Sequence, residues 1–322
     1  MISRVSGTGR RRPVLLAIAG DSAAGKTTLA SGLVAALGPD RCAALSTDDY
    51  QRFDRAERRG RPHTAVHPDS SYINILGQHL QLLASGQPIL KPRYDHTNGR
   101  LTRPELVEPR DFIVVEGLLA LHAKLVRACF DSTVFLDPPE RTRIGWKLRR
   151  DTSARGYTAD QVLAELAARE PESRAYIRPQ REYSDIVVRF AEISGRQDPP
   201  GTPLAAEVLF RPMLHPPDLA AALAPGLTQT IHPRATTDTN GRPVDCLHVH
   251  GYPPRHESDV VEKALWDALD MPAGSLPDCL GRIATEPDSA APAAVGAAPE
   301  GRSAPLAIVQ LLLLHQLFAI EV

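Results

Sequence analysis

The chain has 322 residues, enough for one large α/β domain or for a core with an extension. Its 37 basic and 38 acidic side chains give a formal net charge of -1 at pH 7, and both signs are mixed along the sequence. Such a balance provides no overall attraction to nucleic acid or to an anionic membrane. We therefore expect a small-molecule partner, with neither nucleic acid nor a membrane among the ligands.

Neither of the two longer apolar runs is typical of a membrane or export segment. Residues 14–19 follow three arginines, but the run is short and leads directly into a glycine-rich loop, so a buried strand is expected. Residues 306–320 are fewer than the roughly 20 that a spanning helix needs, and polar side chains interrupt them, so a packed terminal helix is expected. The four cysteines show no metal-ligand spacing, as in a reducing compartment. Together these features predict a cytoplasmic protein.

Short apolar runs alternate with longer amphipathic stretches between residues 13 and 195. The runs typical of strands are 14–19, 42–46, 112–115, 133–136 and 185–188. The stretches typical of helices are 26–37, 73–84, 118–128, 140–150 and 159–168. This alternation predicts an α/β core with a doubly wound, mainly parallel sheet and helices on both faces, whose ligands bind beyond the carboxyl ends of the strands.

The segments on either side of this core have a different composition. Residues 1–12 are expected to form a flexible N-terminus. After residue 195 prolines interrupt the chain, and apolar runs at 205–210 and 246–250 with a helix over 258–269 predict an extension over 196–322 that adds strands and helices. Residues 286–305 are rich in alanine, proline and glycine and predict a mobile loop.

A complete phosphate-binding sequence lies between the first expected strand and the first expected helix. It consists of Gly20, Asp21, Ser22, Ala23, Ala24, Gly25, Lys26, Thr27 and Thr28, and residues 20–27 match G-x-x-x-x-G-K-S/T. The glycines let the backbone wrap around the phosphates of ATP, Lys26 pairs with the β/γ oxygens, and the Thr27 hydroxyl reaches Mg²⁺. A P-loop alone does not distinguish a kinase from an ATPase, a GTPase or a nucleotide-binding regulator.

Two aspartates follow the second expected strand and so lie at the same sheet edge as the P-loop. A carboxylate there can accept the proton of a hydroxyl that attacks the γ-phosphorus of ATP. We expect Asp48 to be this general base. The alternative is that both aspartates cap the segment that follows, a role that suits Asp49.

The apolar strand over residues 112–115 is followed directly by Glu116 and Gly117. An acidic residue that closes a buried strand of a P-loop protein can hold the Mg²⁺ shell, directly or through water. Glu116 is therefore a candidate metal ligand together with Thr27. The alternative is a structural role at the start of the next helix.

The densest basic cluster covers residues 147–155. At helical spacing, Lys147, Arg150 or Asp151, and Arg155 can project toward one side near a helix end, where guanidinium groups suit phosphate oxygens. We expect Lys147 and Asp151 to serve catalysis, with Asp151 either binding Mg²⁺ or orienting Lys147 and Arg155. Arg155 is expected to be a lid arginine that stabilises the transferring phosphoryl group. The alternative is a solvated charged helix.

These residues together resemble the phosphoribulokinase and uridine kinase family of P-loop kinases. The shared features are the P-loop, the Glu116-Gly117 pair, Arg150-Asp151 with Arg155-Gly156, and the sequence P-R-Y-D at residues 92–95. The resemblance covers most of the chain. It implies transfer of the terminal phosphoryl group of MgATP to a hydroxyl of a small molecule, without choosing between a sugar phosphate and a nucleoside.

Three segments are similar to the sugar-phosphate branch of that family. Residues 48–55 resemble its D-D-Y-x-x-x-D-R segment, residues 94–106 its Y-x-H-x-x-G stretch followed by P-E-L, and residues 169–180 its R-x-P and A-Y-I-x-P-Q run. The resemblance implies that the acceptor is ribulose 5-phosphate and the product ribulose 1,5-bisphosphate. The residues expected to bind this substrate are Arg52, Arg55, His96, Arg150, Arg155 and Arg169.

Two alternative functions stay open. One is a uridine or nucleoside kinase, and the other is a nucleotide-binding regulator without phosphoryl transfer, against which Asp48 and Glu116 argue. Ala24 and Ser46 stand where the plant-type enzymes carry cysteines, so thiol-disulfide control is not expected, and Gln51 stands where many members have histidine. The resemblance also implies a homodimer or a higher homo-oligomer.

Overall fold

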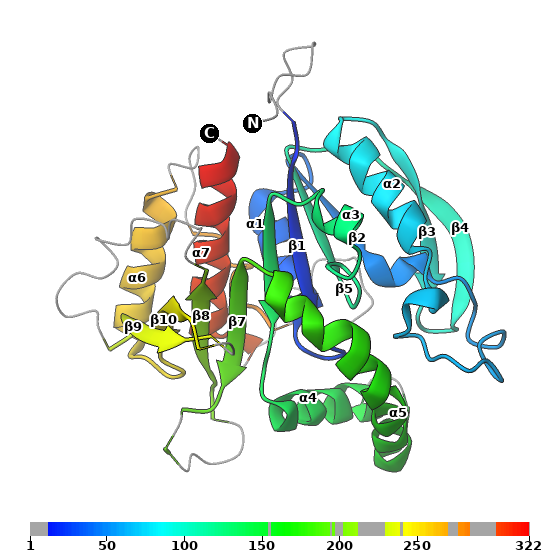
Figure 1. Ribbon diagram of the computed structural model, residues 1–322. Coiled ribbons are helices and arrows are strands. Elements are labelled where there is room, and N and C mark those ends of the chain that lie inside the picture. The colour runs from blue at the N-terminus through cyan, green and yellow to red at the C-terminus, as the bar shows by residue number, and fades with distance from the viewer. Residues whose placement is uncertain are drawn as a thin grey trace.

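A computed structural model describes residues 12–153, 156–193, 195–196, 202–211, 229–238, 241–269, 276–283 and 301–321. The strands of its main sheet are, in chain order, β1 (Val14–Gly20), β2 (Cys42–Ser46), β5 (Phe112–Gly117), β6 (Ser132–Leu136), β7 (Ile186–Ala191), β8 (Ala205–Phe210), β9 (Ile231–Thr237) and β10 (Pro243–Val249). They lie side by side in the order β2-β5-β1-β6-β7-β8-β10-β9 (Figure 1). A separate two-stranded sheet pairs β3 (Ile89–Asp95) with β4 (Arg100–Val107).

The part of the sheet formed by β2, β5, β1, β6 and β7 is entirely parallel. Nearly all residues of β1, β5 and β6 are buried, as expected for strands that are covered on both faces. Along β1, Leu16 and Ile18 join one hydrophobic cluster, whereas Leu15 and Ala17 join clusters on the opposite face. The predicted mainly parallel α/β fold with helices on both faces is confirmed.

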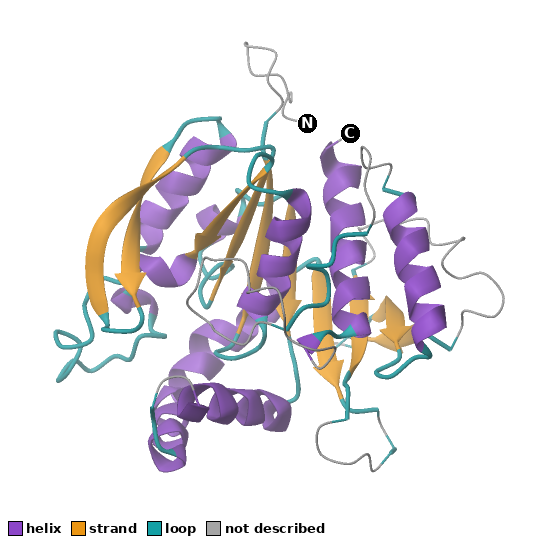
Figure 2. Cartoon of the chain, turned by 180° about the vertical axis from the view of Figure 1, so that it is seen from behind, coloured by secondary structure: helices purple, strands orange, loops and turns teal. Residues whose placement is uncertain are grey.

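The described α-helices are α1 (Lys26–Leu37), α2 (Ile73–Ala84), α3 (Lys124–Arg127), α4 (Glu140–Ser153), α5 (Ala159–Glu172), α6 (Arg255–Asp267) and α7 (Ala304–Glu321). One face of the sheet is covered by α1, α7 and α6, which Figure 2 shows from behind. The other face packs against α2 and α3. Figure 1 shows α4 and α5 across the end of the sheet toward which β1 and β7 point. Ligands of a parallel sheet bind at this end.

The extension continues the main sheet by antiparallel pairing. β8 pairs with β7, β10 pairs with β8, and β9 pairs with β10. β8 has the predicted bounds, β10 starts at Pro243 and covers most of the run predicted at 246–250, and β9 was missed. The added strands thus share a hydrophobic cluster with the core.

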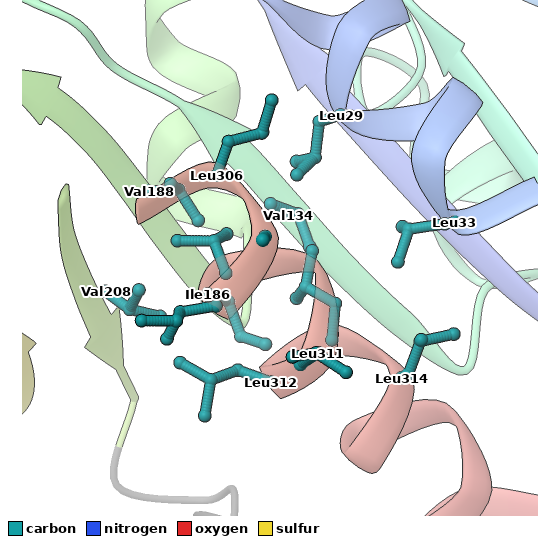
Figure 3. Packing of buried hydrophobic residues seen from close by; sticks show 14 of the residues in the cluster. Leu29, Leu33, Val134, Ile186, Val188, Val208, Leu306, Leu311, Leu312 and Leu314 are labelled. Carbon is teal, nitrogen blue, oxygen red and sulfur yellow. The ribbon is translucent and has the colours of Figure 1, made fainter. Parts of the chain in front are cut away.

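Helix α7 joins the extension to the core. It is apolar on almost all sides, and a helix of that kind must be buried rather than exposed to water. Figure 3 shows Leu306, Leu311, Leu312 and Leu314 among side chains of the sheet and of α1. The predicted packed terminal helix is confirmed. Across the described residues, no helix combines the length and apolar character that crossing a membrane requires.

Several predicted boundaries were wrong. A helix was expected over 118–128, but only Lys124–Arg127 is helical, because the Gln180 side chain binds the backbone of Leu118 and Leu121 and holds that stretch as a loop. The hairpin of β3 and β4 was not predicted. Helix α7 begins at Ala304, within the range predicted as a loop, while residues 286–300 and 1–11 lie outside the described residues.

Candidate active site

The P-loop connects β1 to α1 in a backbone conformation that requires glycine. Gly25 precedes α1 with a φ of 96°, in the left-handed region. At Gly20 a Cβ would lie 2.8 Å from the carbonyl oxygen of Leu136, so only glycine fits beside β6. The buried Lys26 ammonium donates to the backbone oxygen of Asp21 at 3.0 Å, which keeps it over its own loop. The predicted strand–loop–helix setting of the motif is thus present.

The neighbouring strands β2 and β5 end in carboxylates at the same sheet edge. Ser46 and Glu116 are partners in the register of β2 with β5, and Ile18 pairs with Glu116 on the other side. Asp48 follows β2 directly, and its carboxylate accepts the backbone N–H of Leu118 at 3.2 Å. The structure thus brings together the predicted base, the predicted metal ligand and the P-loop strand.

The electrostatics of this corner are set by the burial of Glu116. Burial raises its pKa to about 7; the nearby Lys26 ammonium opposes this rise and the Asp48 carboxylate adds to it. Gly117 permits the close approach of the two strand ends, because a Cβ there would lie 1.8 Å from the Thr47 hydroxyl oxygen. The Asp48 and Glu116 carboxylates together carry more negative charge than the Lys26 ammonium balances, so a further cation would stabilise their charged forms.

Asp49 has a role different from that of its neighbour. Its carboxylate forms an ion pair with the Lys91 ammonium, and the same carboxylate accepts the backbone N–H of Tyr94 at 3.0 Å. Lys91 is buried and also faces Glu105 at 3.7 Å. Asp49 therefore holds the hairpin of β3 and β4 against the end of β2, in line with the supporting role considered for it.

The predicted substrate residues Arg55 and His96 lie together. The Arg55 guanidinium donates to the His96 backbone oxygen at 2.7 Å, and the Arg55 backbone N–H donates to the Gly99 oxygen at 2.7 Å. Gly99 has a φ of 73°, and a Cβ on it would lie 2.6 Å from Arg55 Cβ. The loop after β2 is thereby fastened to the tip of the β3–β4 hairpin.

Two further arginines of this loop have protein partners. Arg58, which the sequence analysis missed, donates to the side-chain oxygen of Gln51 at 2.7 Å and to the Tyr94 hydroxyl at 3.0 Å. Arg52, which is predicted to bind substrate, donates to the Ser71 backbone oxygen at 3.0 Å. A guanidinium has five N–H donors, so these contacts leave others for a ligand.

A charge cluster joins α4 to α5. The Lys147 ammonium lies 2.5 Å from the Asp151 carboxylate and 3.9 Å from Glu165, and Arg150 donates to Asp151 at 2.7 Å. Arg169 of α5 lies 2.5 Å from Glu165. Burial lowers the pKa of Lys147, opposed by its bond to Asp151. Four of the predicted basic and acidic residues thus form one network.

Burial also acts on the carboxyl group within this network. It raises the pKa of Asp151, but the hydrogen bonds from Arg150 and Lys147 outweigh it and lower the pKa overall. Asp151 binds Lys147 and Arg150 in the structure, so of its two predicted roles only the orientation of Lys147 is in line with these contacts, while the orientation of Arg155 and the binding of Mg²⁺ stay predictions. Arg155, predicted as the lid arginine, lies outside the described residues.

Oxygen ligands for Mg²⁺ are available from the predicted pair of residues. Thr27 is exposed in the first turn of α1, and Glu116 is a half-buried residue whose pKa is raised by burial. Hard oxygen donors beside a phosphate-binding loop suit Mg²⁺. Among the described residues, His63, His67 and Asp69 also gather potential ligand atoms within 4.8 Å of one another. The two imidazole rings are stacked at 3.6 Å, so their in-plane nitrogen lone pairs do not converge on one ion.

Comparisons with curated proteins find relatives of two kinds. The chain is 39% identical over 178 residues to the phosphoribulokinase of Synechocystis, covering 55% of this chain and 54% of that protein. It is 33% identical over 180 residues to the uridine kinase of Chloroflexus aggregans, covering 54% of this chain and 86% of that protein. The chain therefore spans about half the length of the curated phosphoribulokinases that it matches.

A solved structure and a family model extend this comparison. The structure of phosphoribulokinase from Rhodobacter spheroides covers 80% of this chain and 96% of its own, with a TM-score of 0.57 and 16% identity, so the fold is shared beyond the nucleotide-binding core. The model of the Phosphoribulokinase / Uridine kinase family matches residues 15–193, more than half of the chain. The chain belongs to the phosphoribulokinase and uridine kinase family.

Proposed function

We propose that this protein transfers the γ-phosphoryl group of ATP to a hydroxyl of ribulose 5-phosphate and releases ADP and ribulose 1,5-bisphosphate. The observation that carries the proposal is the position of Asp48. Its carboxylate lies just beyond the end of β2, beside Glu116, and Glu116 in turn interacts with the P-loop lysine Lys26. A base at this place can act on a hydroxyl that is in line with the γ-phosphate.

The nucleotide would be held by residues 20–28. Backbone N–H groups at the start of α1 and the Lys26 ammonium suit the β and γ phosphates. Thr27 and Glu116 would hold Mg²⁺, which when bound neutralises part of the phosphate charge. Lys26 then exchanges its contact with the Asp21 backbone oxygen for phosphate oxygens.

Proton transfer is assigned to Asp48 rather than Asp49. Asp49 already accepts hydrogen bonds from the Lys91 ammonium and from the Tyr94 backbone. Asp48 accepts one from the Leu118 backbone, which leaves its second oxygen for an acceptor hydroxyl. As the hydroxyl oxygen bonds to the γ-phosphorus, its proton moves to Asp48, and the bond from phosphorus to the β–γ bridging oxygen breaks.

The phosphate of the acceptor requires fixed cations. Arg55 and His96, which meet at the hairpin tip, are one source, and Arg52 is near them in sequence. The second source of cations is on α4 and α5, across the strand ends, and consists of Lys147, Arg150 and Arg169. Arg155, which follows α4 in the sequence, is the proposed lid arginine. A homo-oligomer is part of the same proposal, supported only by the family resemblance.

Identification of the product tests this assignment. Phosphorus NMR of the purified chain with MgATP and ribulose 5-phosphate is expected to show ADP and a sugar bisphosphate in equal amounts. Formation of ADP and inorganic phosphate alone would contradict the proposal, because it would mean hydrolysis. The second candidate is a uridine kinase, favoured by the 86% of the Chloroflexus aggregans protein that the chain covers. Uridine monophosphate as the main product would support that candidate.

A further inference from the structure

Two adjacent residues at the end of α5 contact opposite sides of the proposed site. The Ser173 hydroxyl donates to the Asp21 carboxylate of the P-loop at 2.5 Å. The preceding residue, Glu172, accepts from the backbone N–H of Thr64 at 3.1 Å and also from the Thr64 hydroxyl. Two adjacent residues thus link Asp21 of the P-loop to Thr64, 43 positions further along the chain.

The contact on the nucleotide side is buried and reinforced. Ser173 is 3% exposed, and the Asp21 carboxylate that it binds also accepts the backbone N–H of Ser22 at 2.6 Å. Arg143 of α4 lies 3.7 Å from the same carboxylate and donates to the Ser22 backbone oxygen at 3.3 Å. The position of Ser173 therefore bears on the conformation of residues 21 and 22, which form the P-loop turn.

The contact of Glu172 with Thr64 is connected by hydrogen bonds to the segment next to the proposed general base, Asp48. We call residues 63–72 the acceptor-side loop. Within it, Thr64 Oγ1 accepts the Val66 N–H at 3.2 Å, and the Thr64 backbone oxygen accepts the Ser70 hydroxyl at 2.7 Å. Ser70 in turn accepts the Arg52 N–H at 2.9 Å, and Tyr72 donates to the Tyr50 oxygen at 2.8 Å. The loop is thereby bonded to the segment that directly follows Asp48 and Asp49.

The backbone on either side of the two contacts has an unusual conformation. Pro171 lies inside α5, and the chain continues as a π-helical turn over Ser173–Ile177. Turns of this kind place side chains that a regular helix would direct elsewhere, and they occur often at functional sites. Gln180 holds the following residues by donating to the backbone oxygens of Tyr176 and Leu118. Because Glu172 and Ser173 are adjacent and the turn after them is held in place, a displacement of one residue also moves the other.

We propose that Glu172 and Ser173 are positioning residues that couple the acceptor-side loop to the P-loop. Ordering of the loop by Glu172 sets the place of Ser173 and hence the conformation of Asp21 and Ser22. The two substrates then assist each other's binding, because each stabilises the same arrangement of the turn. This inference rests on the proposed function in one respect, the identity of the acceptor. The contact between Ser173 and the P-loop affects nucleotide binding whatever the acceptor is.

The test measures binding of a non-hydrolysable ATP analogue with Mg²⁺ and without any acceptor. Ser173→Ala removes a hydrogen bond to a charged group and is expected to raise the dissociation constant about tenfold. Thr64 and Glu172 make no hydrogen bond to the P-loop among the described residues, yet Thr64→Val and Glu172→Gln are each expected to raise the dissociation constant by about threefold or more. Arg174→Ala, whose exposed side chain pairs with Glu170 at 3.1 Å, is the matched control and leaves binding unchanged.

The double variant Thr64→Val/Ser173→Ala shows whether the two residues affect nucleotide binding through one coupled turn or independently of each other. If the residues act through one turn, the second substitution adds little to the first, whereas independent contacts give additive effects. Wild-type nucleotide affinity in Thr64→Val and Glu172→Gln, or full additivity in the double variant, would overturn the proposal. Because no acceptor is present, these results are independent of whether ribulose 5-phosphate proves to be the substrate.

Discussion

Gln310 of α7 lies directly over Gly32 of α1, and a Cβ at Gly32 would be 2.0 Å from its side-chain nitrogen. The Gln310 amide donates to the backbone oxygens of Thr28 and Leu29 at 3.3 Å each and accepts the Gly281 N–H at 2.8 Å. The C-terminal helix is therefore hydrogen-bonded to the helix that begins at the P-loop.

Gly32→Ala is expected to destabilise the protein by about 1–3 kcal/mol, because the added methyl group displaces the buried Gln310 amide from its partners. Urea denaturation measures the change in the free energy of unfolding. Gly145→Ala, in a helix where a Cβ meets no atom within 4 Å, is the matched control and should be neutral or stabilising. Equal stability of the two variants would contradict the close approach of α7 to α1.

Lys147→Met tests the charge cluster between α4 and α5. It removes one of the two cations bound to a carboxylate that is 1% exposed, and because Arg150 remains bound the loss should cost about 1.5–3 kcal/mol. Lys263→Met breaks an ion pair of the same i,i+4 spacing, but on an exposed surface, and should cost less than about 1 kcal/mol. The midpoints of urea denaturation for the two variants give the comparison. A similar small loss in both would show that the Lys147–Asp151 pair is exposed to solvent.

Asp49→Asn is expected to weaken the attachment of the β3–β4 hairpin without removing the base. The buried Lys91 ammonium would lose its charged partner, which should cost about 2–4 kcal/mol of stability, while kcat should fall far less than in Asp48→Asn. Glu105→Gln is the control, because Glu105 is exposed and lies 3.7 Å from Lys91. Loss of turnover in Asp49→Asn as severe as in Asp48→Asn would contradict the division of roles between the two aspartates.

The raised pKa of Glu116 predicts how stability depends on pH. Between about 4.5 and about 7 the folded protein holds a proton on Glu116 that the unfolded chain has lost, so this residue makes stability fall as pH rises through that range. Glu116→Gln should remove that decline. Thermal denaturation without Mg²⁺ at pH 5 and pH 8, in the wild type and the variant, measures the difference.

Mg²⁺ adds a second condition to the same experiment. The ion binds the deprotonated carboxylate, so it should raise the melting temperature of the wild type more at pH 8 than at pH 5. In Glu116→Gln this pH dependence of the Mg²⁺ effect should be smaller. An identical response of both proteins to pH and to Mg²⁺ would mean that Glu116 is an ordinary solvated carboxylate.

The sequence predicts well those parts of the fold that depend on local pattern. The strand bounds at 42–46 and 205–210 match the structure, because each is a short, mainly apolar run bounded by polar or proline-containing segments. The meeting of Asp48, Glu116 and the P-loop also follows from sequence, since the carboxyl ends of parallel strands share one edge. These positions need no knowledge of distant contacts.

The sequence does not predict features that depend on distant partners. The residues of β4 are exposed up to its last position, so the hairpin lacks an apolar alternation, and its anchor, Lys91, meets Asp49 across 42 positions. Arg143 and Ser173 reach the P-loop from 121 and 152 positions away. Gln180 prevents a helix at residue 118 through bonds over 62 positions. No local period or motif identifies such pairs.

The roles of Asp48 and of ribulose 5-phosphate are tested together by ADP release with MgATP, with ribulose 5-phosphate and uridine offered in parallel to the wild type and to Asp48→Asn. We expect turnover only with ribulose 5-phosphate, and a loss of about 10²-fold or more in kcat in the variant with the affinity for nucleotide retained. Turnover with uridine, or an Asp48→Asn variant as active as the wild type, would contradict this expectation.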